Sequence, residues 1–127
     1  MELTREEVGR KIIVALDCPP ADAEKVIEQV GHLVGGCKAG LRLCCALGVP
    51  RAIELIKDPN RIAMVDLKFA DVPRQNGWGV EEIVKLGAGM FTAHAITGRA
   101  SMEKMVECKG DALALAITVL TSLGDQD

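Results

Sequence analysis

Residues 64–71 read Met64-Val65-Asp66-Leu67-Lys68-Phe69-Ala70-Asp71, and we interpret the other segments of the chain as a scaffold around this stretch. We predict a β-strand over residues 62–69. Side chains two apart on a strand share a face, so Asp66 and Lys68 are expected to project the same way, with Val65 and Leu67 in an apolar layer. Asp71 follows the strand end, just ahead of a proline.

The charged residues of this stretch suit proton transfer. An ammonium group held between two carboxylates is a positioned acid, because opposite charges nearby favour its charged form. Lys68, between Asp66 and Asp71, has this pattern. By itself the pattern also fits a solvated ion pair at a strand end, which contributes little to stability.

Length and composition predict one soluble α/β domain over residues 1–127. The hydrophobic fraction of 49% is enough for a core. The three aromatic residues and the net charge of −3 offer neither stacking platforms for bases nor a basic patch, so we expect no nucleic-acid partner. No apolar run approaches a membrane span, so we expect no membrane association and a cytoplasmic location.

The cysteines favour a reducing compartment. Five are present, an odd number without metal-ligand spacing: Cys18, Cys37, Cys44, Cys45 and Cys108. With only two histidines and no Cys-x-x-Cys pair, we expect no structural zinc site.

Apolar runs alternate with segments of helical periodicity along the whole chain. The expected strands are residues 11–16, 34–39, 62–69, 90–96 and 112–120. The expected helices are residues 4–10, 21–33, 41–57 with an interruption at Pro50, 75–86 and 101–107. A strand–helix unit that recurs about every 25 residues, with strands apolar on both faces, is typical of a parallel sheet covered by helices.

Each expected strand ends in a polar side chain. These residues are Asp17, Lys38, Asp66 with Lys68, His94, and Thr121 with Ser122. In parallel α/β folds the carboxyl ends of the strands lie on one side, and in eight-unit barrels that side holds the active site. We therefore expect the five strand ends to form one polar cluster.

Five motifs in this order resemble a known family, and together they cover nearly all of the chain. They are Ile13-Val14-Ala15-Leu16-Asp17, Lys38-Ala39-Gly40, Asp66-Leu67-Lys68-Phe69-Ala70-Asp71-Val72-Pro73, His94 with Gly98, and Val119-Leu120-Thr121-Ser122. The family is orotidine 5′-phosphate decarboxylase, an eight-stranded barrel that dimerises and uses neither metal nor organic cofactor. The resemblance implies a TIM-barrel type α/β fold here, as a partial barrel with five parallel strands.

The resemblance also implies a carboxy-lyase that converts orotidine monophosphate to uridine monophosphate and CO₂ in pyrimidine biosynthesis. Lys68 would protonate C6 of the pyrimidine, Asp66 would lie near the departing carboxylate, and Lys38 and Asp71 would complete a charged network. The charged groups of such a network are already in position before substrate binds, which is electrostatic preorganisation.

Substrate-binding roles follow from the same resemblance. Asp17 and Lys38 would contact ribose hydroxyls, Ser122 with Thr121 the pyrimidine, and Asp71 the partner's site across a homodimer interface. Each residue has a simpler alternative: Asp17 as a turn residue, Lys38 as a surface lysine, and Thr121 and Ser122 outside any site. His94 fits a structural role better than a catalytic one.

The sequence departs from the family pattern in three ways. Ala39 in Lys38-Ala39-Gly40 is smaller than the family's usual valine, which affects packing only. Gln75 stands where the family usually has a threonine that serves the partner's site. A barrel of this type has about 200 to 250 residues, so we expect about three units, including the phosphate-binding loops, to be missing from these 127 residues. The alternatives are a metal-dependent 3-keto-gulonate phosphate decarboxylase or hexulose phosphate synthase type enzyme, and a non-catalytic half-barrel module.

Overall fold

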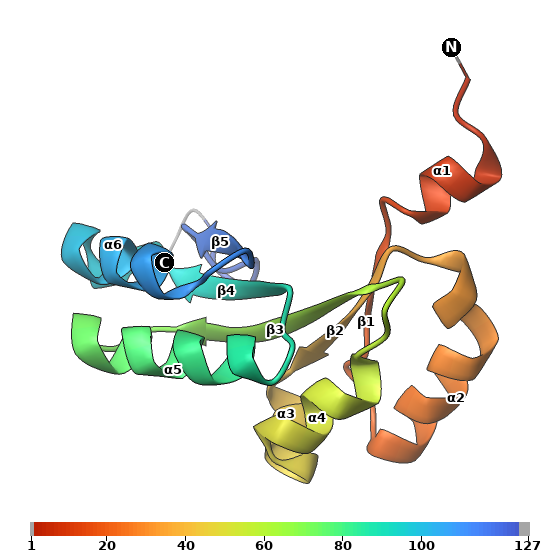
Figure 1. Ribbon diagram of the computed structural model, residues 1–127, viewed down its shortest axis with the longest axis horizontal. Helices are drawn as coiled ribbons and strands as arrows, with labels where there is room; N and C mark the ends of the chain where they lie inside the picture. The colour runs from red at the N-terminus through yellow and green to blue at the C-terminus, as the bar shows by residue number, and fades with distance from the viewer. Residues whose placement is uncertain (1, 125–127) are drawn as a thin grey trace.

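The computed structural model describes residues 2–124, which form one sheet of five parallel strands with helices between them (Figure 1). The strands are adjacent in chain order: β1 (Ile13–Ala15), β2 (Gly36–Gly40), β3 (Ile62–Phe69), β4 (Met90–His94) and β5 (Leu113–Ile117). Parallel neighbours in sequential order are the arrangement of a TIM-type barrel wall. The predicted partial barrel with five parallel strands is confirmed.

The helices that follow β1 lie along one side of the curved sheet, and the first helix lies beyond the amino end of β1 (Figure 1). They are α1 (Arg5–Gly9), α2 (Pro20–Val30), α3 (Leu41–Leu47), α4 (Val49–Ile56), α5 (Pro73–Lys85) and α6 (Arg99–Cys108), with short 3₁₀ turns η1 (Gly31–Leu33) and η2 (Ala95–Thr97). Each of α2, α4 and α5 has a proline in its first turn, where a missing N–H costs nothing. In α5 this proline is Pro73, so the helix begins directly after the charged stretch.

Local signals placed most of these elements correctly. The predicted strand over residues 62–69 has the observed bounds of β3. A capping box begins α1: Glu7 N donates to Thr4 Oγ1 at 3.2 Å, and Thr4 N donates to Glu7 Oε2 at 2.8 Å.

The helix expected over residues 41–57 is divided, but not by Pro50. The break falls at Gly48, whose φ of +75° ends α3 in a conformation that favours glycine. Pro50 lies in the first turn of α4 and begins that helix instead of interrupting one.

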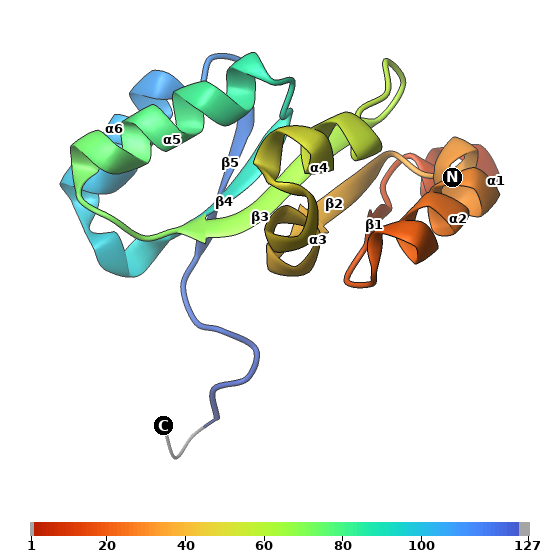
Figure 2. The same cartoon turned by 90° about the horizontal axis from the view of Figure 1, so that it is seen from below.

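The strands are apolar on both faces, as expected, but the outer two are not fully buried. In β1, Ala15 is exposed, and in β5 Leu113 and Leu115 are 51% and 40% exposed. Both strands are edges of an open sheet, and the helices cover only one of its faces. Figure 2 shows the chain leaving the sheet after β5.

The core consists of two apolar clusters that share β3. One lies against α2, α3 and α4 and includes the fully buried Leu43 and Ile56. The other lies against α5 and α6 and includes Val65, Phe91 and Met105. Because β3 contributes to both clusters, the charged residues toward its carboxyl end lie on a strand that is anchored in the core.

Within residues 2–124, no helix has both the length and the apolar character needed to cross a bilayer.

Candidate active site

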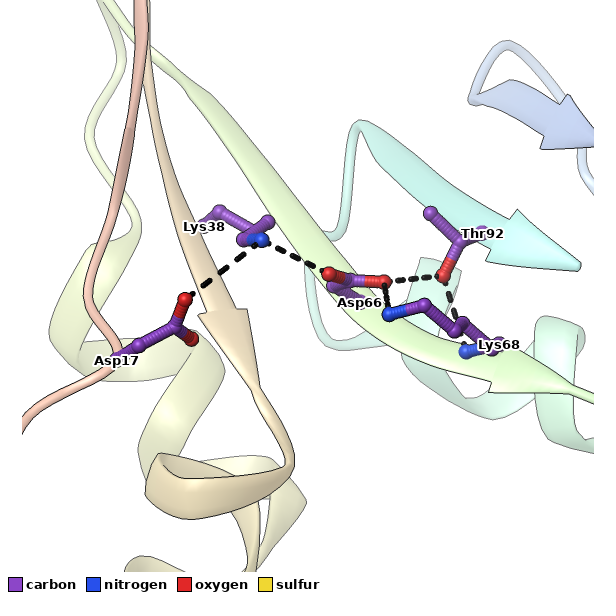
Figure 3. A network of polar contacts seen from close by, with 5 residues as sticks. All are labelled: Asp17, Lys38, Asp66, Lys68 and Thr92. Atoms are coloured by element: carbon purple, nitrogen blue, oxygen red, sulfur yellow. Dashed lines mark hydrogen bonds and ion pairs between the residues drawn. The ribbon is translucent and has the colours of Figure 1, made fainter. Parts of the chain in front are cut away.

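Asp66 is the centre of the polar network at the carboxyl end of the sheet (Figure 3). It is only 9% exposed. Lys68 Nζ lies 2.8 Å from its Oδ1, Lys38 Nζ lies 2.9 Å from its Oδ2, and the Thr92 hydroxyl donates to Oδ1 at 2.8 Å. One buried carboxylate thus receives three hydrogen-bond donors from three neighbouring strands.

The parallel register explains how residues far apart in sequence meet here. Ala15 pairs with Lys38, and Gly40 pairs with Asp66, so the ends of β1, β2 and β3 are aligned. Asp17 follows β1, and its Oδ2 lies 3.9 Å from Lys38 Nζ. The structure therefore joins Asp17, Lys38, Asp66 and Lys68 in one chain of charges, as Figure 3 shows.

Lys68 reaches Asp66 through a bulge and not through regular strand alternation. Val65 pairs with Phe91 and Phe69 with Ala93, so three residues of β3 lie opposite Thr92 alone. Lys68 has a φ of +49°, the one positive φ of a non-glycine residue in the described part of the chain. Such a conformation costs free energy and is found at functional sites.

Thr92 stabilises this strained backbone. Its hydroxyl accepts a hydrogen bond from Lys68 N at 2.9 Å and donates to the Asp66 carboxylate. Thr92 is 2% exposed, so both bonds are shielded from water. A single hydroxyl therefore holds the backbone of one charged residue and the side chain of the other.

The pKa of Asp66 is lowered from 3.8 to about 2. Burial is the largest single influence and acts in the opposite direction, since it disfavours the charged form. The hydrogen bonds from Lys68, Lys38 and Thr92, with the charge of Lys38, together outweigh it. Asp66 is therefore an anion at neutral pH that fixes two cations beside it.

Asp71 lies outside this network, contrary to the expectation that it flanks Lys68. Within residues 2–124, Asp66 is the only carboxylate that forms an ion pair with Lys68. Asp71 is exposed, and its Oδ1 accepts a hydrogen bond from Val72 N at 2.6 Å. The carboxylate of Asp71 is therefore bonded to the turn after β3 and not to Lys68.

The remaining strand ends do not join the network either. His94 is half-buried at the end of β4, and its Nδ1 is buried without a hydrogen-bond partner among the described residues. Thr121 and Ser122 lie in an exposed turn beyond β5. Four of the five strands thus contribute to the polar cluster, with Thr92 as the contribution of β4.

Three polar residues of this region escaped the sequence reasoning: Thr92, Asn76 and Ser101. Thr92 carried a usable signal, since it is a single polar residue inside the apolar run of β4, next to the charged strand. Asn76 and Ser101 lie at ordinary helical positions, and nothing in the pattern distinguished them from exposed residues.

The arrangement suits a reaction in which charge develops on bound substrate. Two ammonium groups are fixed beside one buried carboxylate, so little reorganisation is needed when a substrate arrives. The fold and the site define a class: a parallel α/β barrel wall with a preorganised Asp/Lys network at the carboxyl ends of its strands.

Comparison with known proteins gives the family. The chain belongs to the orotidine 5′-phosphate decarboxylase / HUMPS family, whose model matches residues 10–127. It is 35% identical over 132 residues to the orotidine 5′-phosphate decarboxylase of Moorella thermoacetica, with 96% of this chain and 52% of the relative covered. A Rhodopseudomonas palustris decarboxylase is 39% identical over 120 residues, with 92% and 50% covered.

Solved structures show the same likeness. Orotidine 5′-phosphate decarboxylase from Lactobacillus acidophilus matches with a TM-score of 0.78 and 27% identity, over 91% of this chain and 55% of that structure. The decarboxylase from Pyrococcus horikoshii, at 23% identity and a TM-score of 0.71, shows the same fold. The chain spans about half the length of the relatives it matches.

Proposed function

We propose that this chain supplies the catalytic half of an orotidine 5′-phosphate decarboxylase, a carboxy-lyase of pyrimidine biosynthesis that works without metal or organic cofactor. The observation that carries the proposal is the Lys38–Asp66–Lys68 network, with nitrogen–oxygen distances of 2.9 and 2.8 Å at the carboxyl end of a parallel barrel wall. The substrate is orotidine monophosphate, and the products are uridine monophosphate and CO₂.

In the proposed reaction the bond between C6 and the carboxylate of the substrate breaks, and its electron pair stays on C6. Lys68 then delivers a proton to C6, and water restores the proton of Lys68 after the product leaves. Asp66 lies beside the departing carboxylate. Because the ion pairs of Asp66 are already formed, the site is preorganised before substrate binds.

Substrate positioning is assigned to the flanking residues. Asp17 has 64% of its side chain exposed and lies next to Lys38, so both can reach ribose hydroxyls in front of the strand ends. Thr121 and Ser122 are assigned to the pyrimidine on the basis of the sequence resemblance, and they lie in an exposed turn of the same chain.

The network supports a metal-free reaction better than the metal-dependent alternative. Asp66, the buried carboxylate of the site, is already bonded to two ammonium groups and a hydroxyl. A divalent cation at Asp66 would have to displace one of these cations or lie against them, and like charges at that distance repel. We therefore assign no metal to the site.

A homodimer is proposed from the surface next to Asp71. Three large apolar side chains are exposed in the segments that follow β3 and β4: Val72 at 61%, Trp78 at 51% and Ile96 at 83%. Exposed apolar groups beside an outward-facing carboxylate fit an interface through which Asp71 reaches the partner's site. A cytoplasmic location is proposed on the free state of all five cysteines.

The decisive test is orotidine monophosphate decarboxylation by the protein as its gene encodes it, with Mg²⁺ and with a chelator. We expect equal turnover in both conditions and its loss in Lys68→Ala. Lys85→Ala is the matched control, since Lys85 is an exposed lysine of α5 paired with Glu82. Turnover that requires Mg²⁺, or that survives in Lys68→Ala, contradicts the proposal.

A further inference from the structure

Two buried polar side chains lie behind the turn that carries Asp71. Asn76 of α5 is 1% exposed and Ser101 of α6 is fully buried. A buried amide or hydroxyl destabilises the fold unless it is hydrogen-bonded, and an apolar pair would fill the same space without that cost. The groups to which Asn76 and Ser101 are hydrogen-bonded therefore indicate which part of the fold these two side chains fix.

Both side chains bind the backbone of Asp71. Asn76 Nδ2 donates to the Asp71 carbonyl oxygen at 2.8 Å, and Asn76 Oδ1 accepts from Asp71 N at 3.2 Å. Ser101 Oγ donates to the same carbonyl at 3.0 Å and accepts from Asn76 Nδ2 at 2.6 Å. We call Asn76 and Ser101 the Asp71 bracket.

The bracket connects three elements that are distant in sequence. Asp71 ends the turn after β3, Asn76 lies in the first turns of α5, and Ser101 lies near the start of α6. Gly77 lets the two helices approach, since a Cβ there would lie 3.1 Å from Lys104 Cγ and 3.2 Å from Cys108 Sγ. The turn is thus fixed to two packed helices and not only to its own strand.

The bracket determines where the Asp71 carboxylate can be. Both backbone polar groups of Asp71 are occupied, and its Oδ1 accepts from Val72 N, so backbone and side chain are fixed together. The side chain is nevertheless exposed. A carboxylate that is rigidly held and yet faces solvent is arranged to meet a group outside this chain's own network.

We infer that Asn76 and Ser101 are positioning residues, which act on the reaction through Asp71 and touch no substrate themselves. The inference rests on the proposed function, in which Asp71 completes a site. Displacement of a catalytic group by about 1 Å can cost about 100-fold in rate. Loss of the bracket should therefore lower activity well beyond its effect on folding.

The test uses Asn76→Leu and Ser101→Ala in the protein as its gene encodes it. Asn76→Leu keeps the side-chain size and removes all three amide hydrogen bonds, and we expect kcat/KM to fall about tenfold or more. Val80→Ala is the matched control. Val80 is fully buried one turn further along α5, and its truncation should lower stability while kcat/KM stays unchanged.

A double-mutant cycle separates positioning from a general structural role. If Asn76 acts through Asp71, then Asn76→Leu should lower kcat/KM less than about twofold further when Asp71→Ala is already present. Full additivity of the two effects, or a kcat/KM in Asn76→Leu equal to that of Val80→Ala, overturns the inference.

Amide hydrogen exchange supplies a readout that does not depend on activity. The Asp71 amide should exchange slowly in the wild type and in Val80→Ala, and much faster in Asn76→Leu. Unchanged exchange in Asn76→Leu overturns the bracket. A wild-type protein with no decarboxylation refutes the proposed function instead, and the exchange experiment still decides whether the bracket holds Asp71.

Discussion

Replacement of Thr92 by valine is the sharpest test of the site geometry. The two side chains have nearly the same shape, so the change removes one hydroxyl and leaves the apolar packing of β4 intact. That hydroxyl donates to the Asp66 carboxylate at 2.8 Å and accepts from Lys68 N at 2.9 Å. Thr92→Val therefore breaks two contacts of the network at once.

The expected loss of stability follows from these two bonds. A hydrogen bond to a charged group contributes about 1.5–3 kcal/mol, and a buried donor left without a partner costs about 1–3 kcal/mol. Asp66 keeps both of its ammonium partners, so its charge remains partly compensated. We expect the free energy of unfolding to fall by about 2–4 kcal/mol.

The chemistry should change in the same variant. The pKa of Asp66 should rise, because one of the bonds that favour its charged form is gone. The positive φ of Lys68 loses its support, so the ammonium should be less well placed and kcat should fall. Urea unfolding and the decarboxylation assay measure the two effects.

Thr97→Val is the matched control. Thr97 is a partly buried threonine of η2, just after β4, and its hydroxyl donates to the His94 carbonyl at 2.9 Å, outside the network. It should lose less stability than Thr92→Val and retain kcat. If the two variants are equal in both stability and kcat, the reasoning about Thr92 is refuted.

Three further predictions concern pH, assembly and the chain tested alone. Because the pKa of Asp66 falls from 3.8 to about 2 on folding, it contributes stability above pH 4 that is lost as the pH falls through 2. The free energy of unfolding should fall by about 2 kcal/mol as this contribution is lost. Urea unfolding at pH 5 and pH 2.5 should show this fall in the wild type and not in Asp66→Asn. Light scattering at micromolar concentration should give a dimer or larger assembly, since β1 and β5 leave open edges, and a monomer mass contradicts this. Tested alone, the 127 residues should turn over orotidine monophosphate at a rate about 100-fold or more below that of the same chain joined to the C-terminal half of a relative. The reason is that the two nearby arginines are not placed to bind the substrate phosphate: Arg74 lies over the Trp78 ring at 5.0 Å, and Arg99 binds Glu103 at 2.7 Å. Equal rates refute that expectation.

The sequence by itself determined the order of the elements and the fold class. Apolar runs, helical periodicity and the breakers between them are local signals, and they placed β3 at its observed bounds and the polar residues Asp17, Lys38, Asp66 and Lys68 at strand ends. Parallel topology then aligned those ends, because neighbouring strands in such a sheet run the same way. The charged centre of the site follows from these facts.

The tertiary structure alone decided how that centre is held. In the bulge of β3, three residues face one residue of β4. This pairing register depends on both strands, so it cannot be predicted from the sequence of either strand alone. Thr92 and Asp66 are 26 residues apart, and Ser101 and Asn76 are 25 apart, so their hydrogen bonds form only when separate strands or helices pack. The tertiary structure also left Asp71 outside the Asp66–Lys68 pair, although its place just past the strand end and the family resemblance had predicted it within the network.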